Sequence, residues 1–397
     1  MAVVRLTRSL NVPDPLVVSR YQKIPELGPR ILFFSGGTAL TELSRTLKHY
    51  THNSIHLVTP FDSGGSSATL RDAFDMPAVG DLRSRLMALA DESVLGHPEI
   101  LQLFTYRLPR EQSNDLLHEH LCRMVNGKDP LVEAIPSPMR KLIRDYLSCF
   151  LTAMPKQFEL AGASIGNLIL AGGYLNHHRD LEPILFLFSK LVNVQGTVRA
   201  IVDDNLHLKA ELQDGSQVIG QHRLTGKEVR PLQSPIARFG LCKSLHDPSS
   251  ASAQLSKRNR KLIRQADLIC YPPGSFYSSL MANLLPEGVG RAIARNDCPK
   301  VMIPNLGSDP EQLGMTLEGS LRVLLQQLQG DLPGRHRPTD LLDFLLVDSK
   351  NGHYPGGIPH DWLQSQGIEV IDLSIIDRAD SKRYDREQLV AALLSLA

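Results

Sequence analysis

Two glycine-rich turns, each placed directly after a short apolar run, constrain the fold of this chain more than any other feature. The run "ILFF" at 31–34 leads into "SGGT" at 35–38, and the run "IHLV" at 55–58 precedes "DSGGSS" at 62–67. Between them, residues 39–50 carry apolar side chains at helical spacing. The succession of strand, glycine turn, helix, strand and glycine turn is typical of the start of a doubly wound sheet. We therefore predict an α/β fold on a mostly parallel sheet.

A helical segment follows these turns, from about 81 to 191. Asp81 is placed to N-cap a helix that runs through Ala90, because a carboxylate is favourable at the positive end of a helix. The stretch 165–191 is long and apolar, and Gly172-Gly173 is its expected weak point.

A small antiparallel β insert is predicted at 196–224, where polar and apolar residues alternate around the hairpin signal Asp214-Gly215. Strand and helix patterns then alternate again, which places core strands near 30–60 and between 266 and 373. The most linker-like stretch, "GDLPGRHRPTD", is short. We therefore predict one α/β domain over residues 1–397.

Composition excludes several classes of protein. Hydrophobic residues make up 42% and charged residues 21% of the chain, so it can bury a large core and is not disordered as a whole. The net charge of +1 lacks the basic excess that nucleic acids and anionic membranes attract. The cysteines are scattered without metal-site spacing, as is typical of reduced cytosolic thiols: Cys122, Cys149, Cys242, Cys270 and Cys298. Since neither a signal peptide nor a membrane-length apolar run is visible, we expect a cytoplasmic protein that binds neither nucleic acid nor membrane.

The first turn, Ser35-Gly36-Gly37-Thr38, has the features of a phosphate seat. Glycines after a strand let the backbone approach a ligand closely, and the following helix points free N–H groups at it. The turn lacks both the G-x-G-x-x-G spacing of dinucleotide sites and the lysine of a P-loop. An ordinary strand-to-helix turn stays the alternative.

The second turn, Asp62-Ser63-Gly64-Gly65-Ser66-Ser67, adds a carboxylate and three hydroxyls at the end of the next strand. Ligands of open α/β sheets bind at this edge. Asp62 suits Mg²⁺ or a substrate hydroxyl, and the serines suit phosphate oxygens or a sugar. Aspartate and serine are also common turn formers, but two such turns on neighbouring strands favour a binding site.

Taken in order, the turns of this chain resemble the 2-phospho-L-lactate transferase (CofD-like) family, including its nucleotide-sugar-binding regulatory branch, the YvcK-like proteins. The family begins with G-G-G-T-G-L after a strand, where this chain has S-G-G-T-A-L at 35–40. The regulatory branch continues with D-D-G-G-S-S-G, P-P-G-D-I-R and G-N-L, where this chain has D-S-G-G-S-S-A at 62–68, A-V-G-D-L-R at 78–83 and G-N-L at 166–168.

Further matches follow along the chain. "LKAELQDG" at 208–215 is similar to a family β segment, "PPGSFYSS" at 272–279 is similar to G-P-G-S-L-Y-T-S, and Asn305 follows a strand as in the family. The departures are Ser35 for the first glycine, Ser63 for the second acidic residue, and Leu-Gly-Ser-Asp-Pro-Glu for T-Q-P-G-E after Asn305. The chain is thus identified as a divergent member.

The resemblance implies a Rossmann-like sheet whose strand-end loops surround a nucleoside diphosphate or nucleotide-sugar. For the transferase branch it implies Mg²⁺-dependent transfer of a phospho-group from a nucleoside-diphosphate-linked donor to a hydroxyl acceptor, and Asp62 is then the candidate catalytic residue and metal ligand. The start of the helix after Gly274-Ser275 is a further candidate phosphate seat. Candidate ligand-binding residues share positions in these turns: Gly36, Gly37, Thr38, Gly64, Gly65, Ser66, Ser67, Asp81, Asn167, Gly274, Ser275, Tyr277 and Asn305. Enzymes of this build commonly form homo-oligomers.

Two functions stay open at this point, and transfer is the one we favour because it is the best-defined chemistry of the fold. The alternative is a regulatory protein that binds a nucleotide or UDP-sugar without turnover; the motifs lie nearer that branch, and Ser63 replaces a second acidic residue. A paralogue without ligand is disfavoured by the retained Gly64-Gly65, Asn167 and Gly274-Ser275. Dependence on Mg²⁺ discriminates transfer from binding.

Two other patterns carry less weight. "GASIG" at 162–166 matches G-x-S-x-G, but the residues before it look helical, whereas a nucleophile elbow follows a strand. "SKRNRKLIR" at 256–264 is the densest basic stretch. It predicts a solvated helix face, with steering of an anionic nucleotide as the alternative.

Overall fold

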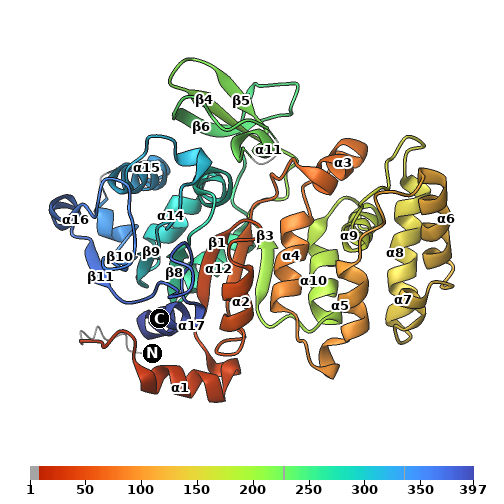
Figure 1. The fold of residues 1–397 in the computed structure, drawn as a ribbon, viewed down its shortest axis with the longest axis horizontal. Coiled ribbons are helices and arrows are strands. Elements are labelled where there is room, and N and C mark those ends of the chain that lie inside the picture. Colours follow the sequence, from red (N-terminus) through yellow and green to blue (C-terminus); the bar gives the residue numbers. More distant parts are fainter. Residues whose placement is uncertain (1–8, 227–228, 335) are drawn as a thin grey trace.

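Seven parallel strands form the central sheet of the protein, whose computed structural model describes residues 9–226, 229–334 and 336–397 (Figure 1). The strand order is β11-β10-β9-β8-β1-β2-β3, and each neighbouring pair is parallel. The strands are β1 (Ile31–Ser35), β2 (Ile55–Val58), β3 (Thr197–Ala200), β8 (Leu268–Tyr271), β9 (Lys300–Met302), β10 (Phe344–Val347) and β11 (Glu369–Asp372).

This order is that of a Rossmann fold with an additional strand, because counting only the strands of the sheet gives 3-2-1-4-5-6-7. The direction of winding reverses between β1 and β8. The loops after these two strands therefore meet at the carboxyl edge of the sheet, where open α/β folds bind their ligands. The predicted doubly wound α/β architecture is confirmed.

Successive residues of the central strand serve different cores, because side chains in a strand alternate between the two faces of the sheet. Ile31 and Phe33 pack in one cluster, and Leu32 and Phe34 in another. The first face is covered by α1 (Pro15–Lys23), α2 (Thr41–Leu47) and α17 (Arg386–Leu396). The second is covered by α12 (Lys257–Gln265), α13 (Ala282–Leu284), α14 (Val289–Ala294), α15 (Leu317–Gly330) and α16 (His360–Gln366).

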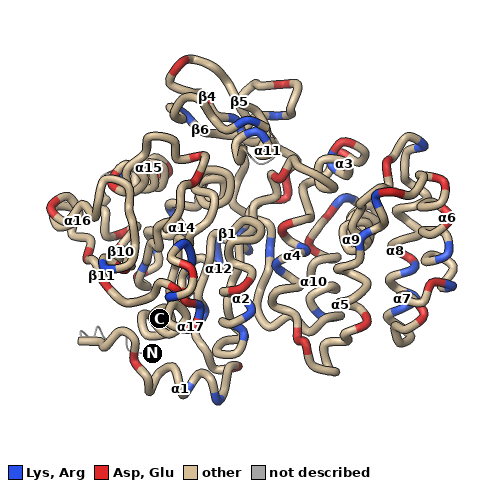
Figure 2. Tube along the Cα trace, viewed as in Figure 1, with Lys and Arg blue, Asp and Glu red and all other residues tan. Residues whose placement is uncertain are grey.

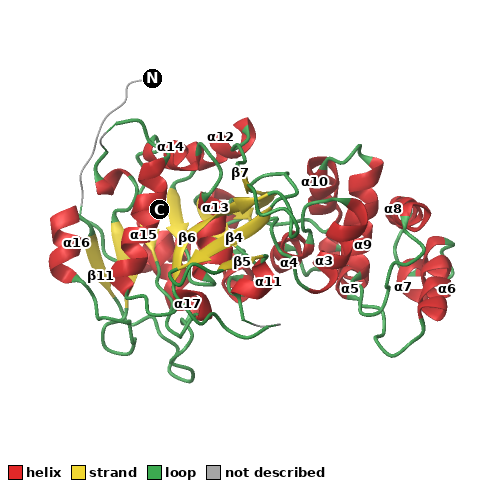
Figure 3. Cartoon of the chain, turned by 90° about the horizontal axis from the view of Figure 1, so that it is seen from above, coloured by secondary structure: helices red, strands yellow, loops and turns green. Residues whose placement is uncertain are grey.

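The predicted helical segment extends from the β3 edge of the sheet (Figures 1 and 3). It shares its apolar core with Val58, Val198 and Ala200 of the sheet. Its helices are α3 (Gly65–Phe74), α4 (Gly80–Leu89), α5 (Pro98–Thr105), α6 (Asn114–Val125), α7 (Pro130–Glu133), α8 (Met139–Ala153), α9 (Ile165–Asn176) and α10 (Leu181–Leu191). Short 3₁₀ turns lie at Pro25–Leu27, Val94–Gly96, Pro310–Gln312 and Pro338–Asp340, and a π-helix lies at Phe276–Met281.

The expected break at Gly172-Gly173 is wrong. The chain breaks after Asn176, where His178 and Arg179 take positive φ angles and Asp180 caps α10. The glycines lie inside α9, where a Cβ would come within 2.0 Å of the Tyr146 carbonyl oxygen at Gly172 and 2.4 Å of Ile184 at Gly173. The two glycines therefore allow close helix packing: α8 contacts α9 at Gly172, and α10 contacts α9 at Gly173.

The boundaries predicted for the β insert, 196–224, are also wrong. Residues 197–200 form β3, an edge strand of the main sheet with only alternate residues buried, and this pattern also mimics a half-exposed antiparallel strand. The insert is a four-stranded antiparallel sheet in the order β5-β4-β6-β7. It contains β4 (His207–Leu212), β5 (Gln217–Ile219), α11 (Gln221–Leu224), β6 (Ile236–Cys242) and β7 (Ser250–Ala251). The hairpin predicted at Asp214-Gly215 does join β4 to β5, with Gly215 at φ 84°.

Asp81 is likewise not the N-cap of its helix. The helix α4 begins at Gly80 with Val79 as N-cap, so Asp81 lies in the first turn. No helix in the described part of the chain is long and apolar enough to span a bilayer.

Candidate functional site

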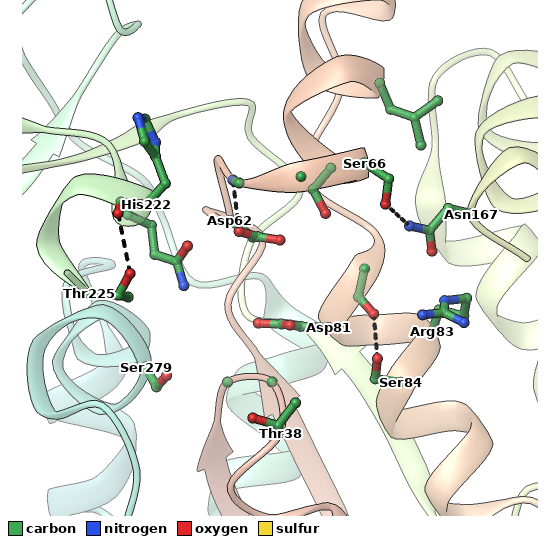
Figure 4. Close-up of a pocket in the computed structure, with 18 of the residues that line it drawn as sticks. Thr38, Asp62, Ser66, Asp81, Arg83, Ser84, Asn167, His222, Thr225 and Ser279 are labelled. Atoms are coloured by element: carbon green, nitrogen blue, oxygen red, sulfur yellow. Dashed lines mark hydrogen bonds between the residues drawn. The ribbon is translucent and has the colours of Figure 1, made fainter. Parts of the chain in front are cut away.

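A cavity of about 840 Å³ lies at the carboxyl ends of β1, β2 and β8. The turns after these three strands form part of its wall, together with the first turn of α4, the insert helix α11 and two loops of the helical segment. Most of the predicted site residues line it: Gly36, Gly37, Thr38, Asp62, Gly64, Gly65, Ser66, Ser67, Asp81, Asn167, Gly274 and Ser275. Figure 4 shows side chains from distant parts of the chain converging on this space.

The first turn packs against the protein on both sides. A Cβ at Gly36 would lie 2.2 Å from Ser279 Oγ, and a Cβ at Gly37 would lie 2.6 Å from Asp81 Oδ1. The buried Arg85 fixes the turn from below, since its Nη2 donates to the carbonyl oxygens of Gly36 at 3.2 Å and Gly37 at 3.0 Å. Burial lowers the pKa of Arg85 to about 10, and the charge of Asp81 opposes this shift. The turn is therefore a preformed part of the cavity wall.

The second turn is held by its own polar groups. The Gly64 amide donates to Asp62 Oδ1 at 3.0 Å, and Asn167 Nδ2 donates to Ser66 Oγ at 3.1 Å. Gly65 has φ 48°, a left-handed conformation that favours glycine, and the space beside it is open. The turn thus presents Asp62 and the hydroxyls at the cavity surface.

Two carboxylates, those of Asp62 and Asp81, lie on the same side of the cavity (Figure 4). Gly80 directly precedes Asp81 and packs closely against the second turn. A Cβ at Gly80 would lie 3.7 Å from Asp62 Oδ2 and 2.7 Å from Ser67 Oγ. Neither carboxylate belongs to a cluster of three or more His, Cys, Asp or Glu side chains, because the described residues contain no such metal-binding group. A cation held here would need donor atoms from a ligand as well.

Three arginines from the helical segment also line the cavity: Arg83, Arg107 and Arg110. Arg83 is only 8% exposed, and its Nη1 donates to the Phe104 carbonyl oxygen at 3.0 Å. Burial, reinforced by the nearby charge of Arg107, lowers the pKa of Arg83 to about 10, which leaves it charged at neutral pH. These arginines bring positive charge to the cavity, whose lining also includes Glu159 of the same segment.

Three polar atoms of cavity-lining residues have no hydrogen-bond partner in the described structure: Ser35 Oγ, Arg83 Nε and Asn167 Oδ1. All three side chains are buried, with Asn167 only 1% exposed. Unsatisfied buried polar groups are costly and rare in native proteins. These atoms lie beneath the cavity surface, and a side-chain rotation toward a polar ligand would satisfy them.

The β insert closes the cavity through α11, which contributes Gln221, His222 and Thr225 to its lining. Ser63, at the position of the second acidic residue of the family motif, does not line the cavity. Its Oγ lies 2.8 Å from His222 Nδ1 and accepts from the His222 amide at 3.3 Å. Position 63 therefore anchors the insert.

The turn after β8 contributes Gly274 and Ser275 to the cavity. Gly274 has φ 145°. Its amide donates to Asn305 Oδ1 at 2.7 Å, and its carbonyl oxygen accepts from Asn305 Nδ2 at 2.8 Å. Asn305 itself lies outside the cavity lining. Its structural role is to hold the Gly274 turn.

The helix start after Ser275 is not the open phosphate seat that the sequence suggested. Its amides are already bound by carboxylates of the loop after β9: Phe276 N donates to Asp309 Oδ2 at 2.7 Å, while Tyr277 N and Ser278 N donate to Glu311 Oε2 at 2.9 and 2.8 Å. The Tyr277 ring is buried against Phe239 and Phe276, outside the cavity lining. The sequence pattern could not reveal this because the carboxylates come from more than 30 residues away.

Glu311 makes the stability of this helix start depend on pH. Burial and the neighbouring Asp309 raise the pKa of Glu311 from 4.5 to about 7, although its hydrogen bonds to residues 277 and 278 oppose the shift. Because the folded pKa exceeds the unfolded value, the stabilisation is fully present below about pH 4.5 and is lost as the pH rises through 7. Urea unfolding measures the free energy of unfolding, which should decline between pH 5 and 8 in the parent protein. We expect Glu311→Gln to reduce this decline by on the order of 2–3 kcal/mol. Parallel pH profiles for the two proteins would contradict this assignment.

Comparison with known proteins agrees with the geometry. A sequence profile of the family described as 2-phospho-L-lactate transferase CofD matches residues 31–376. The chain belongs to the CofD family. It is 28% identical to the gluconeogenesis factor of Bacillus subtilis over 93% of this chain and 98% of that protein. It is 30% identical to the putative gluconeogenesis factor of a Nostoc species over 92% of this chain and 68% of that protein.

A solved structure shows the same fold. The UPF0052-family protein of Bacillus halodurans superposes with a TM-score of 0.66 at 24% identity, covering 92% of this chain and 99% of that one. The resemblance inferred from the turns is thus confirmed.

Within this CofD-family cavity, sequence reasoning missed the arginines and the residues of the insert. Arg83 lies two residues after Asp81 in the stretch "GDLRSR", so the motif that identified Asp81 could also have identified Arg83. Arg107 and Arg110 lie on a loop that contains no motif. An isolated β-bridge between Arg107 and Ser164 pairs this loop with the start of α9 beside the cavity. Nothing in the local sequence predicts their approach to the carboxylates.

Proposed function

We propose that this CofD-family protein binds a nucleoside diphosphate or nucleotide-sugar in the cavity and acts as a regulatory protein without turnover. The observation that carries the proposal is a cavity lined by Arg83, Arg107 and Arg110, in which the buried Arg83 Nε and Asn167 Oδ1 have no hydrogen-bond partner in the described structure. Guanidinium groups form strong, often bidentate hydrogen bonds with phosphate oxygens. Ser66, Thr38 and Thr225 add hydroxyls that suit a sugar.

The carboxylates of Asp62 and Asp81 suit a divalent cation that is shared with the ligand. Mg²⁺ is usually held by one or two carboxylates together with substrate phosphates. Asp62 and Asp81 supply that number, and a diphosphate between them and the arginines would complete the donor set. Bound Mg²⁺ would neutralise phosphate charge, while Arg83, Arg107 and Arg110 orient the phosphate oxygens.

Regulation is favoured over transfer by the environment of position 63. The second acidic residue of the motif is replaced by a serine whose hydroxyl engages His222 of the insert. A ligand at this turn would also contact the insert helix α11, through His222 and Thr225. The names of the two sequence relatives, gluconeogenesis factor and putative gluconeogenesis factor, also describe a factor and not an enzyme.

Transfer is the second candidate, and the cavity-facing Asp62 favours it. In that reaction an acceptor hydroxyl oxygen would bond to phosphorus, the bond to the leaving nucleotide phosphate would break, and Asp62 would take the hydroxyl proton. The family description, 2-phospho-L-lactate transferase, supports the same chemistry. Release of a nucleotide product during incubation with a nucleoside-diphosphate-linked donor and a hydroxyl acceptor would establish it.

Thermal unfolding with and without Mg²⁺ tests the proposal directly, with GDP, UDP and a UDP-sugar as probes. A ligand at ~100 times its dissociation constant stabilises the protein by about 2.7 kcal/mol, which is a measurable shift. We expect stabilisation by at least one of these probes without product formation. If none raises the unfolding temperature at millimolar concentration, the proposed ligand class is wrong.

Asp62→Asn is expected to remove the contribution of Mg²⁺ to ligand affinity. The amide keeps the size and the hydrogen bond from Gly64 but loses the negative charge that attracts the cation. Isothermal titration of the probe with and without Mg²⁺ should give equal affinities in the variant and unequal affinities in the parent protein. An unchanged Mg²⁺ effect in Asp62→Asn would exclude this residue as a metal ligand.

A further inference from the structure

A second, smaller hollow of about 240 Å³ lies between α12 and α14, away from the cavity. Four arginines line it: Arg260, Arg264, Arg291 and Arg295. The two helices lie side by side on one face of the sheet (Figure 3), and basic residues mark α12 in Figure 2. The basic stretch at 256–264 thus forms one half of a concave site.

The spacing of the arginines brings them together. Arg260 and Arg264 are four residues apart on α12, as are Arg291 and Arg295 at α14, and residues at this spacing share one helix face. The scaffold beneath is fixed, because Asn296 Nδ2 donates to the carbonyl oxygens of Ile263 at 2.8 Å and Ala266 at 2.9 Å. The two rows of guanidinium groups therefore face the same hollow from rigid elements.

No carboxylate lines this hollow among the described residues, so most of its positive charge stays uncompensated. Arg291 Nη2 approaches Asp331 at 3.5 Å, and Arg260 Nη2 donates to the Leu255 carbonyl oxygen at 3.4 Å. Arg264 and Arg295 form no ion pair within the described part of the chain. Four cations brought together on two packed helices attract an anion into the hollow between them.

The hollow also lies at the opposite end of the sheet from the cavity. The helix α12 ends just before β8 begins, and α14 ends shortly before β9 begins, so Arg264 and Arg295 lie near the amino ends of these strands. The cavity occupies the carboxyl ends. A ligand of one site therefore does not reach the other.

We propose that this hollow is a second anion site, which takes a compact multivalent anion with phosphate groups. Its volume is below the ~300–1,000 Å³ typical of sites for drug-sized ligands, which favours a small anion over a whole nucleotide. Four guanidinium groups match the charge and the several acceptor oxygens of such a group. The site is independent of the ligand proposed for the cavity.

Titration of inorganic pyrophosphate into the full-length protein, without Mg²⁺, tests this site. The double variant Arg264→Ala/Arg295→Ala should weaken binding by about 10-fold or more, because two charge-assisted contacts are lost. The matched control Lys257→Ala/Lys261→Ala removes two positive charges from exposed positions of α12 that do not line the hollow. The control should bind as the parent protein does.

A second double variant, Arg107→Ala/Arg110→Ala, separates this site from the cavity. It should retain the pyrophosphate binding that Arg264→Ala/Arg295→Ala loses, whatever becomes of the nucleotide binding proposed for the cavity. The proposal is overturned if Arg264→Ala/Arg295→Ala binds pyrophosphate normally, or if the lysine control loses as much affinity. It is equally overturned if removal of Arg107 and Arg110 abolishes all pyrophosphate binding.

Discussion

Arg83→Ala is expected to weaken binding of the nucleoside-diphosphate probe by about 100-fold, because charge-assisted hydrogen bonds to a buried phosphate site are among the strongest polar contacts. Arg83 lines the cavity and is only 8% exposed, and its Nε has no hydrogen-bond partner in the described structure. Its loss removes both the cation and the planar donor fork. Isothermal titration of the folded variant measures the effect.

Three controls make the Arg83 result interpretable. Arg83→Lys keeps the charge but not the fork, so an intermediate affinity is expected. Arg123→Ala removes an exposed arginine of α6 that does not line the cavity and should have no effect. Because Arg83→Ala also deprives the Phe104 carbonyl of its donor and can destabilise the fold, Arg110→Ala serves as an exposed alternative. Full affinity in both Arg83→Ala and Arg110→Ala would place the phosphates elsewhere.

Gly36→Ala is expected to destabilise the protein by about 2–3 kcal/mol and to abolish ligand binding, since overpacking a tight contact forces the backbone apart. The added Cβ would lie 2.2 Å from Ser279 Oγ and 2.6 Å from Ser279 Cβ. Relief cannot come from a flexible side-chain end, because Ser279 is short and sits on the helix after β8. The two loops at the reversal between β1 and β8 must therefore separate. Urea unfolding and ligand titration measure the two effects.

A compensating substitution distinguishes this contact from a general intolerance of alanine in the turn. Ser279→Gly removes both atoms that the new Cβ meets at under 3 Å and leaves Ser279 Cα at 3.4 Å. We expect Gly36→Ala/Ser279→Gly to recover most of the lost binding, apart from about 1 kcal/mol of stability that glycine costs inside a helix. A double variant as defective as Gly36→Ala would show that the packing of these loops is not what the glycine preserves.

The glycine turns show both the reach and the limit of sequence reasoning here. They predicted a doubly wound sheet, because an apolar run followed by glycine and a helical pattern is a local signal. The helical segment was predicted for the same reason. The edge strand β3 was misplaced into the insert, because a strand buried on one face shows the same alternation in a parallel and an antiparallel sheet.

The candidate site was predicted only in part for a related reason. Asp62, Ser66 and Gly274 follow strands of the sheet directly, so their place at its carboxyl edge follows from the order of the elements. The Phe276, Tyr277 and Ser278 amides also follow a strand, yet Asp309 and Glu311 bind them from another loop. Whether a helix start is open depends on what packs against it, and no local pattern contains that information.

The sequence by itself determined the α/β class, the family and the carboxylates of the cavity. Each of these depends on a short run of residues whose periodicity and turn residues specify local structure. Only the tertiary structure decided that Arg107 and Arg110 share a cavity with Asp62 and Asp81, that Ser63 anchors the insert, and that four arginines of α12 and α14 share one hollow. These are contacts between segments far apart in the chain. They arise from how helices pack on the sheet, which burial and shape decide after the local elements have formed.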